Sequence, residues 1–336
     1  MLFKYNFVNH DAEILQKLIE HIVLDVWCNA KGKNFNLNKI KEENNFREIV
    51  KTKRVSLKKH IHDIFKICSN LDDTQLTYIR NAFNVNNNIQ ELCINTINPV
   101  FYDDLSSKIS SVFSEKIKSF FNNLYEKVFN QKPFYINKHY DKFFESNKAI
   151  CPFCGLVSLQ KNSLVHREAY DHYLPKEKYP FNAVNLKNLL PMCSKCNEYY
   201  KDIKDPLFDS GRKKAFFYFG VNPEFNIEIN IINSSVDNFL LDLSFTSPVM
   251  QEEVNTWNRL FVLDERYKND FFYAENNFGA TILNHWYSCS KRDAKYVENE
   301  MYLFEQNPYI DKNFLKKSLL EACIRQDIFN DNLDNL

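Results

Sequence analysis

Four cysteines stand in two C-x-x-C pairs, Cys151 with Cys154 and Cys193 with Cys196. Four thiolates make a soft tetrahedral ligand set that suits Zn²⁺, and a two-residue spacer lets a tight turn direct both sulfurs of a pair at one ion. Because four protein ligands leave no open coordination position, we expect a structural zinc that does not activate water. A rubredoxin-like iron site would use the same sulfurs, and a red, reducible protein would indicate it.

The residues between the two pairs predict a different chemistry. Phosphodiester hydrolysis needs a base for water, a Lewis acid and cations that position phosphate. His172 suits the base because neutral imidazole accepts a proton near pH 7. Asp171 should face the other side of a strand, where its carboxylate and the amide oxygen of Asn197 offer the hard oxygens that Mg²⁺ or Mn²⁺ prefers. Lys176 and Lys178 are candidate phosphate contacts, and ordinary solvated lysines are an equally good interpretation.

The order of these elements resembles the HNH endonuclease family. The matching stretches are CPFC, DHYLP and NLLPMCSKCN, followed by Lys201. The resemblance implies a ββα-metal fold, with a first strand ending at His172, a second over residues 189–192 and a helix after the second cysteine pair. It also implies that His172 is the general base, that Asp171 and Asn197 hold the catalytic metal, and that Asn188 orients the loop of His172. Lys201, one residue further on than the commonest C-N-x-x-K spacing, is a candidate substrate contact.

The elements that must position these residues can be predicted from apolar periodicity. Helical spacing runs from Ile14 to Trp27, and one long helix is expected from Asp103 to Val128. Residues 225–231 and 241–245 alternate apolar and polar side chains, which predicts two strands joined as a hairpin. The predicted fold is α+β, with a central zinc-stapled ββα unit. Its three regions are a mainly helical N-terminal region (1–148), an HNH nuclease domain (149–214) and a mixed α/β C-terminal region (215–336).

Charge and hydropathy limit where the protein acts and what it contacts. The chain has 43 Lys and Arg against 43 Asp and Glu, so its net charge of zero does not favour a protein coated in nucleic acid. Basic residues do concentrate in 31–59 and in 151–214, which leaves local basic faces. The opening residues lack a secretory pattern, and no apolar run is long enough to cross a bilayer. We therefore expect a cytoplasmic protein that does not bind membranes.

Together these features predict a metal-dependent HNH endonuclease that cleaves DNA, with structural Zn²⁺ and catalytic Mg²⁺ or Mn²⁺. One such site cuts one strand, so double-strand cleavage requires a homodimer or two successive nicks. The large unassigned flanks resemble effectors of bacterial anti-phage defence, such as the nuclease partner of an ATPase in the Septu type, which implies an ATPase partner. The alternative is a non-enzymatic zinc-ribbon module that binds nucleic acid or protein. That alternative explains the cysteines but gives no reason for the order of Asp171, His172, Asn188 and Asn197.

Overall fold

The computed structural model describes residues 1–51, 57–129, 131, 134–161, 168–291, 293 and 295–329. By its internal contacts the chain divides into two units. The large unit comprises Lys4–Ala149 and Leu159–Val221, and the small unit comprises Met1–Phe3, Ile150–Ser158 and Asn222–Leu336. Helices and short sheets occur together, so the predicted α+β class is confirmed. The three regions expected from the sequence stay a prediction.

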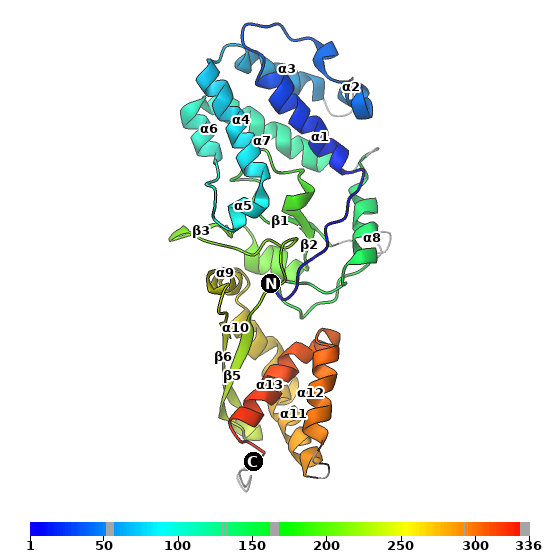
Figure 1. Cartoon of the computed structure of the whole chain (residues 1–336), viewed down its shortest axis with the longest axis vertical. Helices are drawn as coiled ribbons and strands as arrows, with labels where there is room; N and C mark the ends of the chain where they lie inside the picture. The colour runs from blue at the N-terminus through cyan, green and yellow to red at the C-terminus, as the bar shows by residue number, and fades with distance from the viewer. Residues whose placement is uncertain are drawn as a thin grey trace. The chain divides into compact units, whose positions relative to one another are not determined.

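The large unit begins with a series of helices, of which α1, α3, α4, α6 and α7 are gathered together in Figure 1. Their apolar faces form its core. For example, Trp27 is fully buried and its Nε1 donates to the Ile61 carbonyl at 3.1 Å. The helices are α1 (Glu13–His21), η1 (Ile22–Trp27), η2 (Leu37–Lys39), η3 (Glu43–Asn45), α2 (Phe46–Lys51), α3 (Leu57–Cys68), α4 (Asp73–Asn87), α5 (Ile89–Cys93), α6 (Tyr102–Lys108), α7 (Ser111–Asn123), η5 (Leu124–Val128) and α8 (Ile136–Ser146).

The single long helix predicted from Asp103 to Val128 is wrong. The helix α6 ends at Lys108 and α7 begins at Ser111, because Ser110 takes an extended backbone conformation and its side chain accepts a hydrogen bond from the Phe113 amide. A serine in that conformation caps a new helix rather than continuing an old one.

Short strands follow the helices in the large unit. The strands β1 (Tyr170–His172) and β2 (Leu189–Pro191) pair antiparallel, with His172 opposite Leu189. A strand therefore ends at His172 and another begins at Leu189, where the sequence predicted them. The 3-10 helix η6 (Leu186–Asn188) leads into β2, the π-helix η7 (Lys195–Lys201) follows it, and a second pair consists of β3 (Phe208–Asp209) and β4 (Gly211–Arg212).

The small unit is built on the hairpin that the alternation predicted, which is confirmed. The strand β5 (Asn226–Asn233) pairs antiparallel with β6 (Leu240–Thr246), with the 3-10 helix η8 (Val236–Asn238) between them. One face of the hairpin is buried, and its Phe245 ring lies 5.3 Å from that of Trp257. The remaining helices are α9 (Gln251–Phe261), α10 (Leu263–Tyr267), η9 (Lys268–Phe272), α11 (Ala274–Ser290), α12 (Tyr296–Gln306), η10 (Ile310–Lys312) and α13 (Asn313–Arg325).

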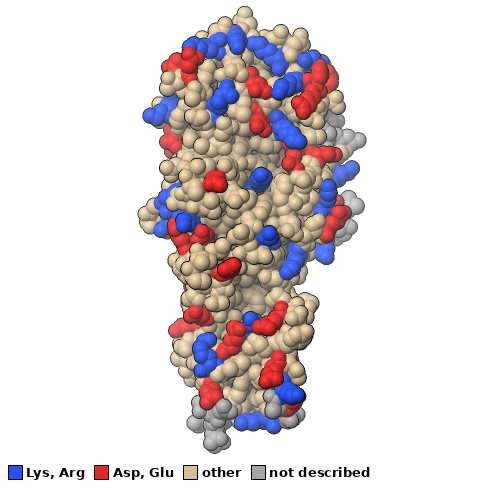
Figure 2. All heavy atoms as spheres, in the orientation of Figure 1, with Lys and Arg blue, Asp and Glu red and all other residues tan. Residues whose placement is uncertain are grey.

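Among the helices of the described residues, none has the length and apolar character needed to cross a bilayer. Lys and Arg are interspersed with Asp and Glu over the face drawn in Figure 2. Residues of both signs are therefore mixed on this face.

Candidate metal centre and active site

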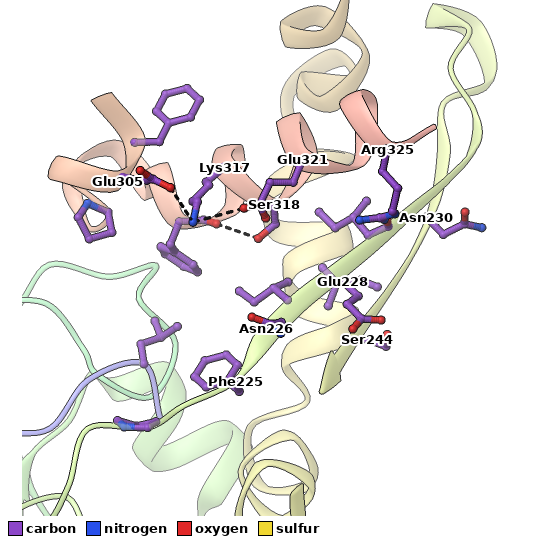
Figure 3. A pocket seen from close by; sticks show the side chains of 18 of the residues that line it. Phe225, Asn226, Glu228, Asn230, Ser244, Glu305, Lys317, Ser318, Glu321 and Arg325 are labelled. Atoms are coloured by element: carbon purple, nitrogen blue, oxygen red, sulfur yellow. Dashed lines mark hydrogen bonds and ion pairs between the residues drawn. The ribbon is translucent and has the colours of Figure 1, made fainter. Parts of the chain in front are cut away.

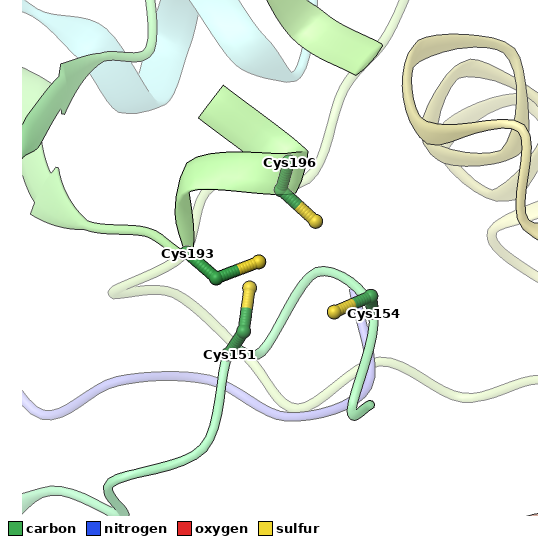
Figure 4. Close-up of side chains that lie close together, drawn as sticks. All are labelled: Cys151, Cys154, Cys193 and Cys196. Carbon is green, nitrogen blue, oxygen red and sulfur yellow. The ribbon is translucent and has the colours of Figure 1, made fainter. Parts of the chain in front are cut away.

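The four cysteines of the two C-x-x-C pairs lie together, with their sulfurs turned toward one another (Figure 4). Their Sγ atoms are all within 4.8 Å of one another, and all four residues are buried. A tetrahedral Zn²⁺ with Zn–S bonds of about 2.3 Å separates its sulfurs by about 3.8 Å. The cluster therefore fits one metal ion such as zinc, as predicted.

The first cysteine pair is held in a tight turn. The Gly155 amide donates to the Cys151 carbonyl at 2.8 Å, and the Cys151 amide donates to the Val157 carbonyl at 2.9 Å. Gly155 has φ +66°, and a Cβ at this position would collide with the Leu2 side chain. Glycine meets both requirements because it has no Cβ and tolerates positive φ. Tyr267 donates from its hydroxyl to the Cys154 carbonyl at 3.0 Å, which fixes the turn further.

His172 is the last residue of β1, and its half-buried ring is held on two sides. Its Nε2 lies 2.9 Å from the Ala183 carbonyl oxygen, and the ring of Tyr125 meets it edge to face at 4.3 Å. A carbonyl oxygen can only accept, so Nε2 carries the proton and Nδ1 keeps its lone pair. Burial lowers the pKa of His172 to about 3, against the smaller opposing effect of the Ala183 hydrogen bond. The imidazole is therefore neutral at physiological pH.

Asp171 precedes His172 and has different partners, as strand alternation predicts. It is buried, and its Oδ1 accepts from the Lys201 Nζ at 3.0 Å. Burial raises the pKa of this carboxyl, and the Lys201 ammonium opposes the shift. Among the residues that the structure describes, its Oδ2 is buried with no hydrogen-bond partner. Such an oxygen favours a cation or a hydrogen-bond donor beside it.

Lys201 lies at the end of η7 with its side chain only 1% exposed. Its Nζ also donates to the His172 carbonyl at 2.9 Å, so one ammonium ties together two successive residues of β1. The structure thus places Lys201 in a buried ion pair, whereas the substrate contact predicted for it needs an accessible ammonium.

The π-helix explains how Lys201 reaches β1 despite its unusual spacing from Asn197. A backbone bond from the Asp202 amide to the Asn197 carbonyl, at 2.8 Å, spans five residues rather than the four of an α-helix. A π-turn accommodates one additional residue within a helical turn, and such turns are frequent at functional sites. Asn197 itself is half-buried at the start of this turn, on the same helix as Lys201.

Asn188 is fully buried and closes the loop that follows β1. Its Nδ2 donates to the Leu174 carbonyl at 3.0 Å, and its Oδ1 accepts from the Leu174 amide at 2.8 Å. Its own carbonyl accepts from the Tyr173 amide at 3.0 Å. Three hydrogen bonds from one residue therefore fix the chain directly after His172.

Lys176 and Lys178, which stand on either side of Glu177, are both paired with other side chains. Lys176 Nζ lies 3.0 Å from both Asn122 Oδ1 and Glu177 Oε1. Lys178 is half-exposed, and its Nζ lies 3.6 Å from the buried Asp205. That these lysines contact phosphate stays a prediction. A bound phosphate would compete with the side chains that now pair with them.

Three contributors to the site had no signal in the sequence. The Ala183 carbonyl is a backbone group that any residue supplies, so no residue type marks it. Tyr125 lies in η5, within a chain rich in aromatic residues, and only the fold brings its ring to His172. His139, which has no motif around it, anchors the start of β1 through a 2.6 Å hydrogen bond between its Nδ1 and the Tyr170 hydroxyl.

Comparisons with known proteins cover only part of the chain. No protein family model matches it, and no solved structure matches it. The chain is similar to a curated protein described as Protein ea31 from Escherichia phage lambda, with 36% identity over 74 residues. The matched segment is 22% of this chain and 23% of that protein. The chain thus matches less than a quarter of the length of this relative.

Proposed function

We propose that this protein is a metal-dependent endonuclease of the HNH type that hydrolyses DNA phosphodiester bonds. The observation that carries the proposal is the state of His172, a neutral imidazole whose Nε2 is fixed by the Ala183 carbonyl, which leaves Nδ1 as the basic nitrogen. The antiparallel β1 and β2 strands with the following η7 helix support a ββα arrangement around it.

In the proposed mechanism, His172 Nδ1 accepts the proton of the attacking water. The bond from Nε2 to Ala183 stabilises the ring in the required tautomer, and the Asn188 hydrogen bonds keep the following loop in place. Asp171 Oδ2 and the Asn197 amide oxygen would hold Mg²⁺ or Mn²⁺. When bound, this ion would offset negative charge on the phosphoryl oxygens and the leaving group. The cysteine cluster would hold a structural Zn²⁺.

The direct test is nicking of supercoiled plasmid in Mg²⁺ or Mn²⁺ by the wild type and by His172→Ala. General base catalysis contributes about 10²- to 10⁴-fold, so nicking by the variant should fall by about that factor. His285→Ala is the matched control, because His285 is an exposed histidine of the small unit. Equal nicking by wild type and His172→Ala, with zinc content unchanged, would refute the proposal.

We also propose that the protein is an anti-phage effector with an ATPase partner, and the distribution of charge supports this role. Neutral net charge and mixed surface charge suit a nuclease that a partner recruits to DNA, because tight intrinsic binding would need a basic surface. Co-purification of an ATPase, and loss of phage protection in a His172→Ala strain, are the expected results. A non-enzymatic zinc-ribbon module would account for the cysteine cluster but gives no role to the His172 tautomer.

A further inference from the structure

A groove of about 1040 Å³ lies in the small unit between the strand β5 and the helices α12 and α13 (Figure 3). In the figure α13 comes close to β5 at Arg325 and Asn230, and the two diverge toward Lys317 and Asn226. The groove is therefore a wedge that opens toward the N-terminal half of β5.

The edge of β5 that faces α13 is capped at one end by side chains. Gln326 accepts from the Ile231 amide at 2.8 Å and donates to the Ile231 carbonyl at 2.9 Å. Arg325 donates to the Ile229 carbonyl. These bonds show that the backbone groups of Ile229 and Ile231 point away from β6, toward α13. The Gln326 side chain thus reproduces the pair of hydrogen bonds that a neighbouring strand would make.

Further along the same edge, the backbone groups have no such cap. In an antiparallel strand, residues two apart direct their amide and carbonyl to the same side, so Ile227 points outward like Ile229 and Ile231. Among the described residues, neither the Ile227 amide and carbonyl nor the Ile229 amide has a hydrogen-bond partner on that side. Both residues line the groove. An uncapped strand edge is a template for another extended chain.

Side chains also cap part of the outer edge of β6. The Tyr273 hydroxyl bonds to both the amide and the carbonyl of Leu241, at 3.1 and 3.0 Å, and Gln251 donates to the Phe245 carbonyl at 3.2 Å. Among the described residues, the amide and carbonyl of Leu243 have no such partner, so the two edges are capped to a similar extent. What distinguishes β5 is the groove beside its edge.

The charged side chains around the groove are mainly acidic. Its lining includes Glu228, Asp242, Glu305 and Glu321 against only Lys317 and Arg325. Lys317 Nζ lies 3.2 and 3.3 Å from the carboxylates of Glu305 and Glu321, so these three groups are paired with one another, and Arg325 binds the Ile229 carbonyl. The other two carboxylates are those of Glu228 and Asp242, and the lining keeps an excess of two negative charges. The excess of negative charge favours a positively charged ligand.

We propose that this groove binds an extended basic segment of a partner protein, which adds to β5 as a third strand. Pairing with the half-buried Ile227 supplies the main-chain hydrogen bonds, and the acidic rim selects Lys or Arg side chains. Ile229, which is 1% exposed and has its carbonyl bonded to Arg325, closes the inner end of the groove. This inference is independent of the nuclease proposal, because every residue in it belongs to the small unit.

Fluorescence anisotropy with short labelled peptides tests the proposal on the full-length protein. The probe is an acetylated and amidated peptide of four Lys-Val repeats, and the acidic comparison peptide has four Glu-Val repeats. The Lys-Val peptide should bind at least about tenfold more tightly, because rim charges favour one sign and oppose the other. No binding of the Lys-Val peptide up to millimolar concentration, or equal binding of the two peptides, would overturn the proposal.

A second experiment distinguishes strand addition from simple charge attraction. Two further Lys-Val peptides carry backbone N-methyl groups, either on every Lys or on every Val, so that each loses the amide protons of one edge. One of these two should lose binding, since only one edge faces β5, and the other should keep it. Equal affinity for the parent peptide and both methylated forms would show that no strand pairing occurs.

Variants of the protein locate the site. Glu228→Gln combined with Glu321→Gln should weaken binding of the Lys-Val peptide about three- to tenfold, as expected for the loss of two exposed charge contacts. Glu298→Gln is the matched control, because Glu298 is an exposed carboxylate of α12 outside the groove. Equal weakening in the control and in the double variant would place the binding elsewhere.

Discussion

The imidazole of His172 combines burial with a fixed tautomer, and both follow from its position at the end of β1. Its Nε2 bonds to Ala183, Tyr125 covers one side of the ring, and burial lowers its pKa to about 3. A base that is neutral at every physiological pH is always ready to accept a proton. A pKa this low also makes it a weak base. Efficient transfer therefore needs the negative charge of a bound phosphate, which raises the pKa of the imidazole, whereas a cation beside the ring would lower it further.

The low pKa of His172 predicts a pH-dependent loss of stability. An unfolded histidine titrates near 6.5, so between about pH 6.5 and 3 the unfolded chain binds a proton that the folded chain does not. Stability therefore falls as the pH falls through this window. From pH 7 to 5 the wild type should lose about 2 kcal/mol more than His172→Asn does in urea unfolding. His285→Asn, at an exposed position, should behave like the wild type, and identical slopes in all three proteins would contradict the assignment.

Lys201 and Asp171 form a buried pair in which each partner depends on the other. In Lys201→Met the Asp171 carboxylate would stay buried without its cation, which should cost about 3–5 kcal/mol of unfolding free energy. Adding Asp171→Asn should recover part of that loss, because it removes the uncompensated charge. Lys118→Met breaks an exposed pair with Glu177 and should cost less than about 1 kcal/mol. Equal costs for the two lysines would contradict a buried ion pair.

At the scale of the element, local patterns were more predictable than the contacts between elements. The C-x-x-C spacing encodes tight turns, so the cysteine cluster could be predicted, and strict alternation identified the β5 and β6 hairpin. The break at Ser110 was missed because a serine is compatible with both a helix interior and a cap, and only its backbone conformation decides. The burial of Lys201 was also missed, since the π-turn that brings it to β1 has no sequence signature.

The cysteine turns predict how the protein responds to loss of metal. Cys154→Ser or Cys193→Ser should reduce the zinc content from one equivalent per chain to near none, measured by atomic emission. The binding free energy of a structural zinc contributes to folding, so the Tm of either variant should fall by at least about 10 °C. Cys289→Ser changes a half-buried cysteine outside the cluster and should keep both zinc and Tm. Full zinc retention by the two cluster variants would exclude the four-sulfur site.

At the scale of the whole molecule, the distribution of charge bears on how the proposed nuclease would bind DNA. The 43 basic residues are balanced by 43 acidic ones, and the two lysines predicted to contact phosphate are paired, Lys176 with Glu177 and Lys178 with Asp205. A phosphate that binds there must displace a carboxylate from its lysine. Each such contact therefore adds little net positive charge and releases few of the cations bound to DNA. In the proposed nuclease, this arrangement would combine a complete cleavage site with weak binding of nucleic acid.

The salt dependence of DNA binding measures this directly. A protein that neutralises six to ten phosphates shows a slope of log K against log salt of about −5 to −9. Because the lysines beside the site are already paired, the isolated protein should show a slope no steeper than about −3 on a short duplex. The double variant Glu177→Gln and Asp205→Asn removes one carboxylate partner from each lysine and should steepen the slope by about one to two units. A wild-type slope steeper than −5 would mean that a basic surface elsewhere holds the DNA, and recruitment by a partner would then be unnecessary.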